Sequence, residues 1–314
     1  MNEILLTMGM PVYNEEKYIG KAIESLLAQT YKNFILIISD NASTDRTQQI
    51  CEGYAHKDKR ITYIRHKENK GALFNFRYVL EQTTTPYFMW CAGHDKWHPL
   101  FVEKLLPALG KDNIILSYSN VRLIGLDGTI GKTYECYYDT TSINSPVKRL
   151  FCLLRLLNEG SMFNGVWLTQ ALKSCAFDFK THFFDNTILE QASLEGKFKQ
   201  NKEVLFWFRF VRAPETKNEA ERRQLIYATG KESSAKASIN AQKTMHLFES
   251  VKIIFIKKYR VPVIDKIRLT AAIIYYKSII LFVLPIVHTL LDKILPEKAF
   301  LKLKKFWRKN HYKG

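Results

Sequence analysis

Short apolar runs alternate with amphipathic helical stretches along the first 120 residues, and this alternation limits the fold more than any other feature of the sequence. Apolar runs of this length that end at turn residues are typical of buried strands. The runs cover residues 4–10, 34–39, 61–65, 87–91 and 114–119. Strand, helix and strand in repeated succession, joined by short loops, predict a parallel sheet with helices on both faces.

Apolar residues at helical spacing predict helices between these runs, at residues 15–30, 73–82 and 99–109. A further helix follows residue 43, where Ser43 can cap it and Asp45 lies in its first turn, near the positive end of the helix dipole. Ligands of parallel sheets bind at the carboxyl ends of the strands. We therefore expect a site in the loops at residues 11–16, 40–47 and 92–99.

Periodicity is weaker from residue 121 to residue 240, where two further helices are predicted at 147–157 and 187–196. From about residue 241 the chain becomes helical, apolar and basic. We therefore predict a main domain over residues 1–240 and a helical extension over residues 241–314.

The net charge of +17 is concentrated in the C-terminal extension. Residues 241–314 contain 16 Lys and Arg against 4 acids, which leaves +12, while the first 240 residues contain 31 against 26, which leaves +5. A basic segment with interleaved aromatic residues suits either nucleic-acid phosphates or the anionic inner leaflet of a membrane. We expect the membrane and no nucleic-acid partner, because the main domain, where the site is expected, is nearly balanced in charge.

Residues 269–291 are apolar over a length that would span a bilayer, but Lys277 lies near the middle, and Pro285 and His288 interrupt the second half. Lys266, Lys277 and His288 recur every eleven residues and so share one face of a helix. A polar stripe of this kind indicates packing rather than a transmembrane span. The C-terminal helices are predicted to bind the anionic membrane surface or to join copies of the chain in a homo-oligomer.

The five cysteines form no CxxC pair and no spacing of a zinc site. A scattered, odd set is typical of a reducing compartment, where cysteines pack as small apolar residues. The N-terminus agrees, since Ile4-Leu5-Leu6 is too short for a signal peptide and has no basic lead-in. We expect a cytoplasmic protein that is peripheral on the inner face of the cell membrane.

The sequence contains neither of the two common glycine-rich phosphate loops, GxGxxG and GxxxxGKS/T. Other motifs follow the predicted strands and helices: MPVYNEE at 10–16, QTY at 29–31, SDNASTDRT at 39–47, NKG at 69–71, PYFMW at 86–90 and HDKWHP at 94–99. In this order they resemble the signature of the family 2 glycosyltransferases, closely over about the first 110 residues and more loosely to about residue 210.

The resemblance implies a GT-A fold, an α/β fold with a mostly parallel central sheet, here followed by the helical extension. It implies that about residues 1–120 hold a nucleotide-sugar donor and that about residues 121–240 hold an acceptor. The residues that match donor-binding positions are Pro11, Tyr13, Asn14, Glu15, Asp40, Asn41, Gly71, Asn75 and Asp95.

Asp40 or Asn41 at a strand end can offer a hydrogen-bond acceptor to a uracil or similar ring. Other donor-binding positions have a purely structural alternative. Tyr13, Asn14 and Glu15 could instead only shape the turn after the first strand. Asn75 could instead lie on a solvated helix face.

The metal-binding loop departs from the family pattern. Family members carry Asp-x-Asp followed by another acid, whereas this chain reads Ala92-Gly93-His94-Asp95, with His94 at the position of a metal ligand. Imidazole binds Mn²⁺ acceptably and Mg²⁺ poorly, so His94 and Asp95 favour Mn²⁺ over Mg²⁺, or a weak or absent dependence on a divalent cation. The alternative is that His94 caps a loop and Asp95 caps the following helix.

Asp185 opens a predicted helix in the sequence FFDNTIL and matches the acid of the family's acceptor site. The resemblance implies that Asp185 is the general base, which takes the proton of the attacking hydroxyl in a single displacement that inverts the anomeric centre. An Asp at such a place is otherwise a helix cap. Asn164 and Trp167 match a segment near the sugar and acceptor, where Trp167 is either a stacking surface or a core residue.

These features predict an inverting glycosyltransferase that moves a sugar from a UDP-sugar to a hydroxyl of a glycan or lipid-linked acceptor during synthesis of a cell-surface polysaccharide. Two alternatives stay open. A sugar-phosphate nucleotidyltransferase would need a glycine-rich loop with Lys and Arg after the first strand, which the sequence lacks. The other alternative is a catalytically inactive basic protein that binds a membrane or nucleic acid, because the acidic motif is incomplete.

Overall fold

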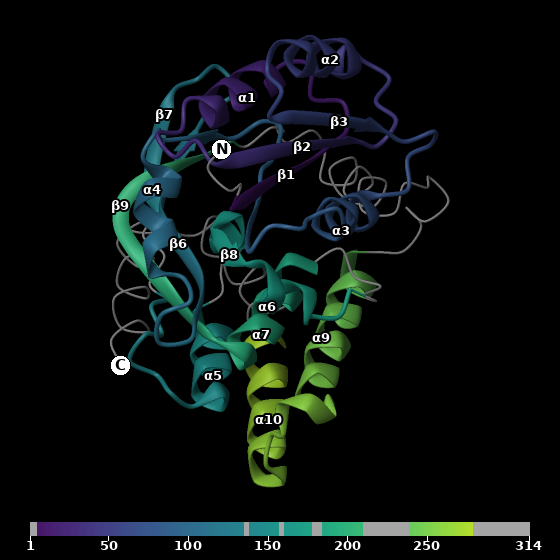
Figure 1. The fold of residues 1–314 in the computed structure, drawn as a ribbon. Helices are drawn as coiled ribbons and strands as arrows, with labels where there is room; N and C mark the ends of the chain where they lie inside the picture. Colours follow the sequence, from purple (N-terminus) through teal and green to yellow (C-terminus); the bar gives the residue numbers. More distant parts are fainter. Residues whose placement is uncertain (1–4, 135–137, 157–159, 178–183, 210–238, 279–314) are drawn as a thin grey trace, which may run out of the picture.

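The computed structural model describes residues 5–134, 138–156, 160–177, 184–209 and 239–278. Its strands are β1 (Leu6–Val12), β2 (Phe34–Asp40), β3 (Ile61–Arg65), β4 (Tyr87–Trp90), β5 (Lys96–Trp97), β6 (Ile114–Ile124), β7 (Ile130–Tyr134), β8 (Val166–Leu168) and β9 (Lys197–Arg209). They form one nine-stranded sheet in the order β3-β2-β1-β4-β8-β6-β9-β5, with β7 paired to β6 (Figure 1).

Most strands of this sheet run in one direction. β1 pairs in parallel with both β2 and β4, and β2 with β3, so the carboxyl ends of these four strands lie at the same edge. β8 runs antiparallel between β4 and β6, and β9 pairs in parallel with β6. β5 and β7 are antiparallel to their partners. The predicted α/β fold with a mostly parallel sheet is confirmed.

Helices cover both faces of the sheet. They are α1 (Ile19–Leu27), α2 (Thr47–Lys57), α3 (Ala72–Glu81), α4 (Phe101–Leu105), α5 (Pro146–Leu156), α6 (Thr169–Lys173), α7 (Phe184–Glu195), α9 (Ile239–Phe255) and α10 (Val263–Ser278), with the 3-10 helices η1 (Leu106–Ala108), η2 (Gly160–Asn164) and η4 (Lys257–Tyr259). One buried core contains residues of α1, α2 and α4, and a second contains residues of α3, α5, α6 and α7.

The alternation of side chains along each strand separates these two cores. On β1, Leu6, Met8 and Met10 belong to the core of α1, α2 and α4. On β4, Phe88 and Trp90 belong to the core of α3 and α7. Every residue of β1 is buried, so this central strand is covered on both faces, as its continuous apolar sequence predicts.

The N-terminal strands and helices agree closely with the predictions, with one correction. The strand predicted at residues 61–65 is confirmed as β3. Ser43 does not cap α2, which begins only at Thr47. Instead, the Asp45 carboxylate accepts a hydrogen bond from the Thr47 backbone N–H at 2.9 Å. The Ser43 side chain is used elsewhere, in the contact between two loops described below.

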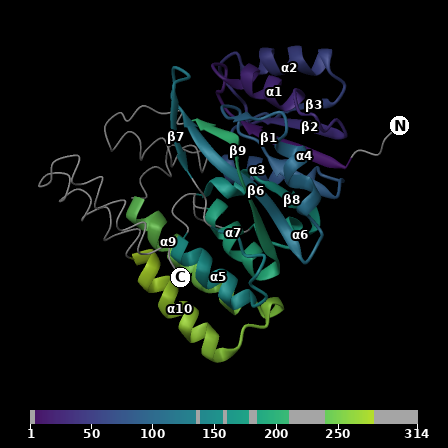
Figure 2. The ribbon, with the colours of Figure 1, turned by 90° about the vertical axis from the view of Figure 1, so that its left-hand side faces the viewer.

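The first part of the C-terminal extension packs against the domain, at the far end of the molecule from α1 and α2 (Figure 2). Ile253 and Ile254 of α9 and Leu269 and Ile273 of α10 form a third buried core with residues of α5 and α7. Among the helices in the described segments, none is both long enough and apolar enough to cross a bilayer. The predicted apolar segment 269–291 lies outside the described residues beyond residue 278, and the division near residue 240 stays a prediction.

Gly9 on β1 gives a test of the packing between β1, β4 and α3. A Cβ at Gly9 would lie 2.8 Å from the Phe88 ring and from Val79 Cγ2, and both side chains are fully buried. We expect Gly9→Ala to lower the free energy of unfolding by about 1–3 kcal/mol, because the close-packed core cannot make room without strain. Urea unfolding monitored by fluorescence measures this change.

Gly53→Ala on α2 is the matched control. Nothing lies within 4 Å of the Cβ that this change adds, and alanine is favoured over glycine inside a helix by about 0.5–1 kcal/mol. We therefore expect Gly53→Ala to be neutral or stabilising. Equal effects of the two substitutions would contradict the packing described for β1.

Candidate active site

The loops that follow β1 and β2 are tied together at the carboxyl edge of the sheet. The Asn14 backbone N–H donates to Ser43 Oγ at 2.9 Å, and the Glu15 backbone N–H donates to Thr47 Oγ1 at 2.8 Å. In return, the Thr44 backbone N–H donates to Asn14 Oδ1 at 2.8 Å. Two of the three loops in which the site is expected are therefore in contact, and Asn14 shapes the turn, which was its structural alternative.

Both loops contain a residue in the left-handed backbone region. The φ angles are 55° for Asn14 and 63° for Ala42. Asparagine tolerates this region, whereas for alanine it costs about 1–2 kcal/mol. Strain of this kind is often found at functional sites, where surrounding contacts hold it in place. Here the hydrogen bonds between the two loops supply those contacts.

Asp40, the last residue of β2, is fully buried, and both its carboxylate oxygens have partners. Oδ1 accepts the Ser43 backbone N–H at 2.8 Å, and Oδ2 accepts the Tyr63 hydroxyl at 2.7 Å. Burial, together with this carboxylate, raises the pKa of Tyr63 above its usual range. Asp40 therefore holds the loop in this structure, and its contact with a nucleotide base stays a prediction.

Asn41 connects the end of β2 to the start of α3. Its Nδ2 donates to Asn69 Oδ1 at 2.8 Å and to the Gly71 carbonyl at 3.0 Å, while its Oδ1 accepts the Lys70 backbone N–H at 3.0 Å. Gly71 has φ 86° immediately before α3, a conformation that glycine adopts without strain. The Asn-Lys-Gly motif thus forms the turn that brings α3 over the edge of the sheet.

Asn75 points inward from α3 to the same edge. Its Oδ1 accepts the Ser39 hydroxyl at 2.6 Å, and its Nδ2 donates to the carbonyls of Ser39 at 2.8 Å and of Val12 at 3.4 Å. The alternative of a solvated face is therefore wrong for Asn75. Arg77, two residues further along α3, does lie on the outer side, where its half-exposed side chain pairs with Glu81.

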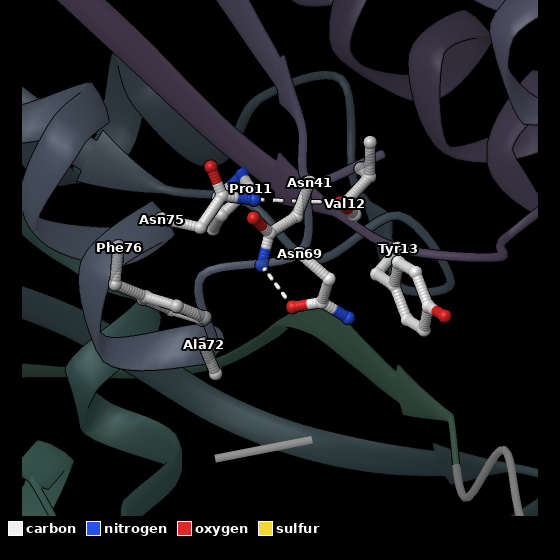
Figure 3. Close-up of a pocket in the computed structure, with 8 residues that line it drawn as sticks. All are labelled: Pro11, Val12, Tyr13, Asn41, Asn69, Ala72, Asn75 and Phe76. Carbon is white, nitrogen blue, oxygen red and sulfur yellow. Dashed lines mark hydrogen bonds between the residues drawn. The ribbon is translucent and has the colours of Figure 1, made fainter. Parts of the chain in front are cut away.

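A small pocket opens where these groups meet (Figure 3). Four of the predicted donor-binding residues line it, namely Pro11, Tyr13, Asn41 and Asn75. Val12, Asn69, Ala72 and Phe76 also line it and were not predicted. Asn69 belongs to the Asn-Lys-Gly motif and could have been included, whereas an apolar helix residue such as Phe76 carries no sequence signal.

Three titratable side chains, those of Glu15, His94 and Asp95, meet at the same edge of the sheet, between the loops after β1 and β4. His94 Nδ1 and Glu15 Oε1 lie 2.8 Å apart, and Asp95 Oδ1 accepts the Arg209 backbone N–H at 2.8 Å. Glu15 Oε2 and Asp95 Oδ2 are buried and have no hydrogen-bond partner among the described residues. Buried carboxylate oxygens without partners are costly unless a proton or a cation compensates them.

This cluster fits a divalent cation that takes further ligands from a bound substrate. Hard cations prefer oxygen ligands, and Mg²⁺-type sites often use one or two carboxylates plus substrate phosphates. In the part of the chain that the structure describes, no group of three His, Cys, Asp or Glu residues is arranged to hold a metal ion. The protein would therefore supply only part of the shell, and the metal-binding roles of His94 and Asp95 stay predictions.

Arg209, which was not predicted, closes the cluster from β9. Its Nε donates to the His94 carbonyl at 3.0 Å and its Nη1 to the Gly125 carbonyl at 2.6 Å. The guanidinium lies 4.4 Å from the centre of the Tyr18 ring, within cation–π range. These contacts fix the backbone of the loop that carries His94 and Asp95.

Asp185 lies in the first turn of α7 and is connected to the pocket by aromatic packing. Phe184 packs edge-on against the pocket residue Phe76, with ring centres 5.1 Å apart, and also against Phe163, at 6.2 Å. The Asp185 side chain is partly exposed, and its Oδ1 accepts a hydrogen bond from the backbone N–H of the next residue, Asn186, at 2.8 Å. Asp185 thus follows a residue that packs on the pocket residue Phe76, and its role as the base stays a prediction.

The segment around residue 164 needs one correction. Asn164 is partly exposed at the end of η2, directly after Phe163, whose ring packs against the pocket residue Phe76, and its contact with a sugar or acceptor stays a prediction. Trp167 on β8 is fully buried, donates its ring N–H to the Phe163 carbonyl at 2.9 Å and packs against Trp90 and Phe198. Trp167 is therefore a core residue in this structure, and the prediction of a stacking surface is wrong.

The pKa of Asp95 gives a test of this buried cluster. Burial raises the pKa of Asp95 from 3.8 to about 6, and the nearby Glu15 carboxylate adds to the rise while His94 and Arg209 oppose it. The folded chain thus holds this proton more tightly than the unfolded chain does. Ionisation of this carboxyl therefore does not change the free energy of unfolding below about pH 4. Its full destabilising effect on the metal-free protein is reached above about pH 6.

We expect Asp95→Asn to remove this pH dependence. The free energy of unfolding of the variant minus that of the parent chain should increase by about 3 kcal/mol from pH 4 to pH 8, since each pKa unit corresponds to 1.36 kcal/mol. Urea titrations in the presence of EDTA measure this difference. A difference that stays constant across this pH range would show that burial does not raise the pKa of Asp95.

Comparison with known proteins places this geometry in a family. Residues 7–163, half of the chain, match the model of glycosyl transferase family 2. The chain is 31% identical over 125 residues to the putative teichuronic acid biosynthesis glycosyltransferase TuaG of Bacillus subtilis, which covers 40% of this chain and 50% of TuaG. It is 29% identical over 211 residues to the uncharacterized glycosyltransferase RT0329 of Rickettsia typhi, which covers 66% of this chain and 59% of the relative. In both cases the chain spans less than two thirds of the relative's length.

Solved structures share the fold. TarS 1–349 of S. aureus in complex with UDP has a TM-score of 0.53 at 16% identity, over 88% of this chain and 90% of TarS. The mannosyltransferase PcManGT of Pyrobaculum calidifontis has a TM-score of 0.50 at 11% identity, over 90% of this chain and 88% of PcManGT. Both are GT-A enzymes, and at these identities they establish the fold alone. With that fold, and with half of its length matched by the family model, the chain belongs to glycosyl transferase family 2.

Proposed function

We propose that this glycosyltransferase moves a sugar from a UDP-sugar to a hydroxyl group of a glycan or lipid-linked acceptor, with inversion at the anomeric carbon. The observation that carries the proposal is the small pocket at the joined ends of β1, β2 and α3, at the same edge of the sheet as the buried carboxylates of Glu15 and Asp95. A nucleotide-sugar enzyme needs this combination, because the base and ribose require a slot and the diphosphate requires a cation or basic groups.

The ligands of the structural neighbours support a nucleotide-sugar donor. TarS was solved with UDP and with UDP-GlcNAc, and PcManGT with GDP-Man and Mn²⁺. In this chain, the half-buried Tyr13 ring and the amides of Asn69 and Asn75 face the pocket. We assign Tyr13 to stacking on the base and the Asn69 amide to its polar edge or to the ribose, because the Asn75 amide is already bonded to Ser39 and Val12.

We assign the cation to Asp95 and His94, with Mn²⁺ favoured over Mg²⁺ because one ligand is an imidazole. A bound cation would neutralise the charge that develops on the departing diphosphate. The chain's own contribution is positional. Glu15 orients His94, and Arg209 holds the backbone of the loop that carries both residues.

We assign the general base to Asp185. Its carboxylate stands in the first turn of α7, directly after Phe184, which packs against the pocket residue Phe76. The acceptor hydroxyl would lose its proton to Asp185 as it attacks the anomeric carbon, while the bond to the diphosphate breaks on the opposite side. One displacement of this kind inverts the configuration of the sugar.

We place the reaction in the synthesis of a cell-surface polysaccharide, at the inner face of the membrane. The relation to TuaG, a putative teichuronic acid biosynthesis enzyme, supports the polysaccharide. The basic C-terminal extension supports the membrane location. Family membership argues against the two alternatives, a nucleotidyltransferase and an inactive binding protein.

Tyr13 tests the donor pocket. Stacking of a base on an aromatic ring contributes about 1–3 kcal/mol, so we expect Tyr13→Ala to weaken UDP binding by about 5- to 150-fold. Tyr13→Phe keeps the ring and should bind UDP nearly as tightly as the parent chain. Isothermal titration with UDP and Mn²⁺ measures both variants, and equal affinity of Tyr13→Ala and the parent chain would place the base elsewhere.

Asp185 tests the proposed mechanism. We expect Asp185→Asn to lower kcat by about 10²- to 10⁴-fold, the usual contribution of a general base, with donor affinity nearly unchanged. Nucleotide release from UDP-sugars in the presence of an acceptor extract measures turnover. The matched control is Asp127→Asn, a fully exposed loop carboxylate that should have no effect. Unchanged turnover in Asp185→Asn would remove Asp185 as the base.

A further inference from the structure

The C-terminal helices expose an unusual amount of apolar surface. Of the nine large apolar side chains that are exposed in the described residues, seven lie on or beside α9 and α10: Phe248, Phe255, Val263, Ile264, Ile267, Ile274 and Tyr275. Soluble proteins rarely leave such a group uncovered unless it serves as a contact surface.

On α10 these side chains form a continuous stripe. Ile264, Ile267, Ala271, Ile274 and Tyr275 recur at helical spacing, and the two first isoleucines are 56% and 61% exposed. The opposite side of α10, with Leu269 and Ile273, is buried against α5 and α9. A helix that is apolar on both sides is normally buried all round, so the outer stripe calls for a partner. We name the side chains of this stripe, together with Phe255 and Val263, the α10 outer face.

Positive charge surrounds the α10 outer face. Residues 239–278 contain eight Lys and Arg against two acids, a net charge of +6. Arg268 is 71% exposed within the stripe, where its Nη1 lies 3.7 Å from Asp265 Oδ1, and Arg260 is exposed in the turn before α10. The Lys266 ammonium lies 5.3 Å from the centre of the Phe255 ring, so basic and apolar side chains are interleaved where α9 meets α10.

We propose that the α10 outer face docks on an anionic lipid bilayer, with its aliphatic side chains in the interface and its basic side chains at the headgroups. Amphipathic helices that carry Lys and Arg beside exposed apolar residues bind membranes in this way. Each basic residue near such a surface adds about 1 kcal/mol to binding. The proposal extends the membrane location given above by identifying a surface for it.

Charge favours a bilayer over a second copy of the chain. Two copies joined through this face would bring together two segments, residues 239–278 of each copy, that each carry a net charge of +6, and like charges repel. Lysine is also depleted in protein interfaces, whereas the Lys266 ammonium lies 5.3 Å from the centre of the Phe255 ring on this face. An anionic bilayer accommodates both features.

Docking at this face would fix the orientation of the catalytic domain, because the C-terminal helices are tied to α7. Thr187 Oγ1 lies 3.3 Å from His246 Nδ1 near the start of α7, and Tyr259 donates to Gln191 at 3.4 Å in its middle. At its end, Lys258 Nζ donates to Glu195 Oε1 at 2.5 Å. α7 carries Asp185, so these contacts connect the docking surface to the proposed base.

Vesicle flotation of the full chain tests the proposal. The vesicles contain phosphatidylcholine alone or with phosphatidylglycerol, and the test variant is the double substitution Ile264→Ser with Ile267→Ser. We expect the parent chain to float with the anionic vesicles, less so at high salt, and the variant to bind at least about tenfold more weakly. Ile130→Ser on β7, 68% exposed and far along the chain from α10, is the control and should float like the parent.

Three outcomes would overturn the proposal. The first is a parent chain that does not float with anionic vesicles, and the second is a double variant that floats as well as the parent. The third is a parent chain that light scattering shows to be an oligomer and that the double substitution converts to a monomer, which would assign the face to a second copy. Thermal unfolding of the variant checks that it is folded. We expect these substitutions to leave nucleotide release without vesicles unchanged, so a failure of docking is distinguishable from a failure of the proposed activity.

Discussion

The parallel pairing of β1 with β2 on one side and with β4 on the other is the constraint on which the rest of the structure depends. It brings the carboxyl ends of three strands to one edge of the sheet, so the three loops that follow them must share that edge. The pocket forms between the first two loops and α3. The cluster of Glu15, His94 and Asp95 forms between the first loop and the third.

The polar residues at this edge have two roles: they hold the backbone in place by hydrogen bonds, and they line the pocket. Asn75 makes hydrogen bonds to Ser39 and Val12, and Asn41 to the turn before α3, because backbone groups beyond the strand ends need partners once they are buried. The same residues line the pocket. A substitution of Asn41 or Asn75 would therefore change the shape of the pocket as well as its chemistry, which makes Tyr13 the cleaner probe of donor binding.

The local patterns of the sequence predicted the first half of the fold well, because apolar runs and helical spacing are strong in α/β units. These patterns did not predict the role of a side chain where contacts with distant parts of the chain determine it. Ser43 is a good cap by type, but the loop after β1 uses its hydroxyl instead. Trp167 could equally stack on a ligand or fill a core, and only the packing of β8 decides. The long β9 begins with polar residues, so neither this strand nor Arg209 at its end could be predicted.

The central claim is that the β1–β2–α3 pocket holds the nucleotide of the donor. A crystal structure of the chain grown with UDP and Mn²⁺ tests it most directly. The account predicts the uracil ring against Tyr13, between Asn69 and Asn75, with the diphosphate and the cation next to Asp95. A nucleotide bound at any other place, with this pocket empty, would contradict it.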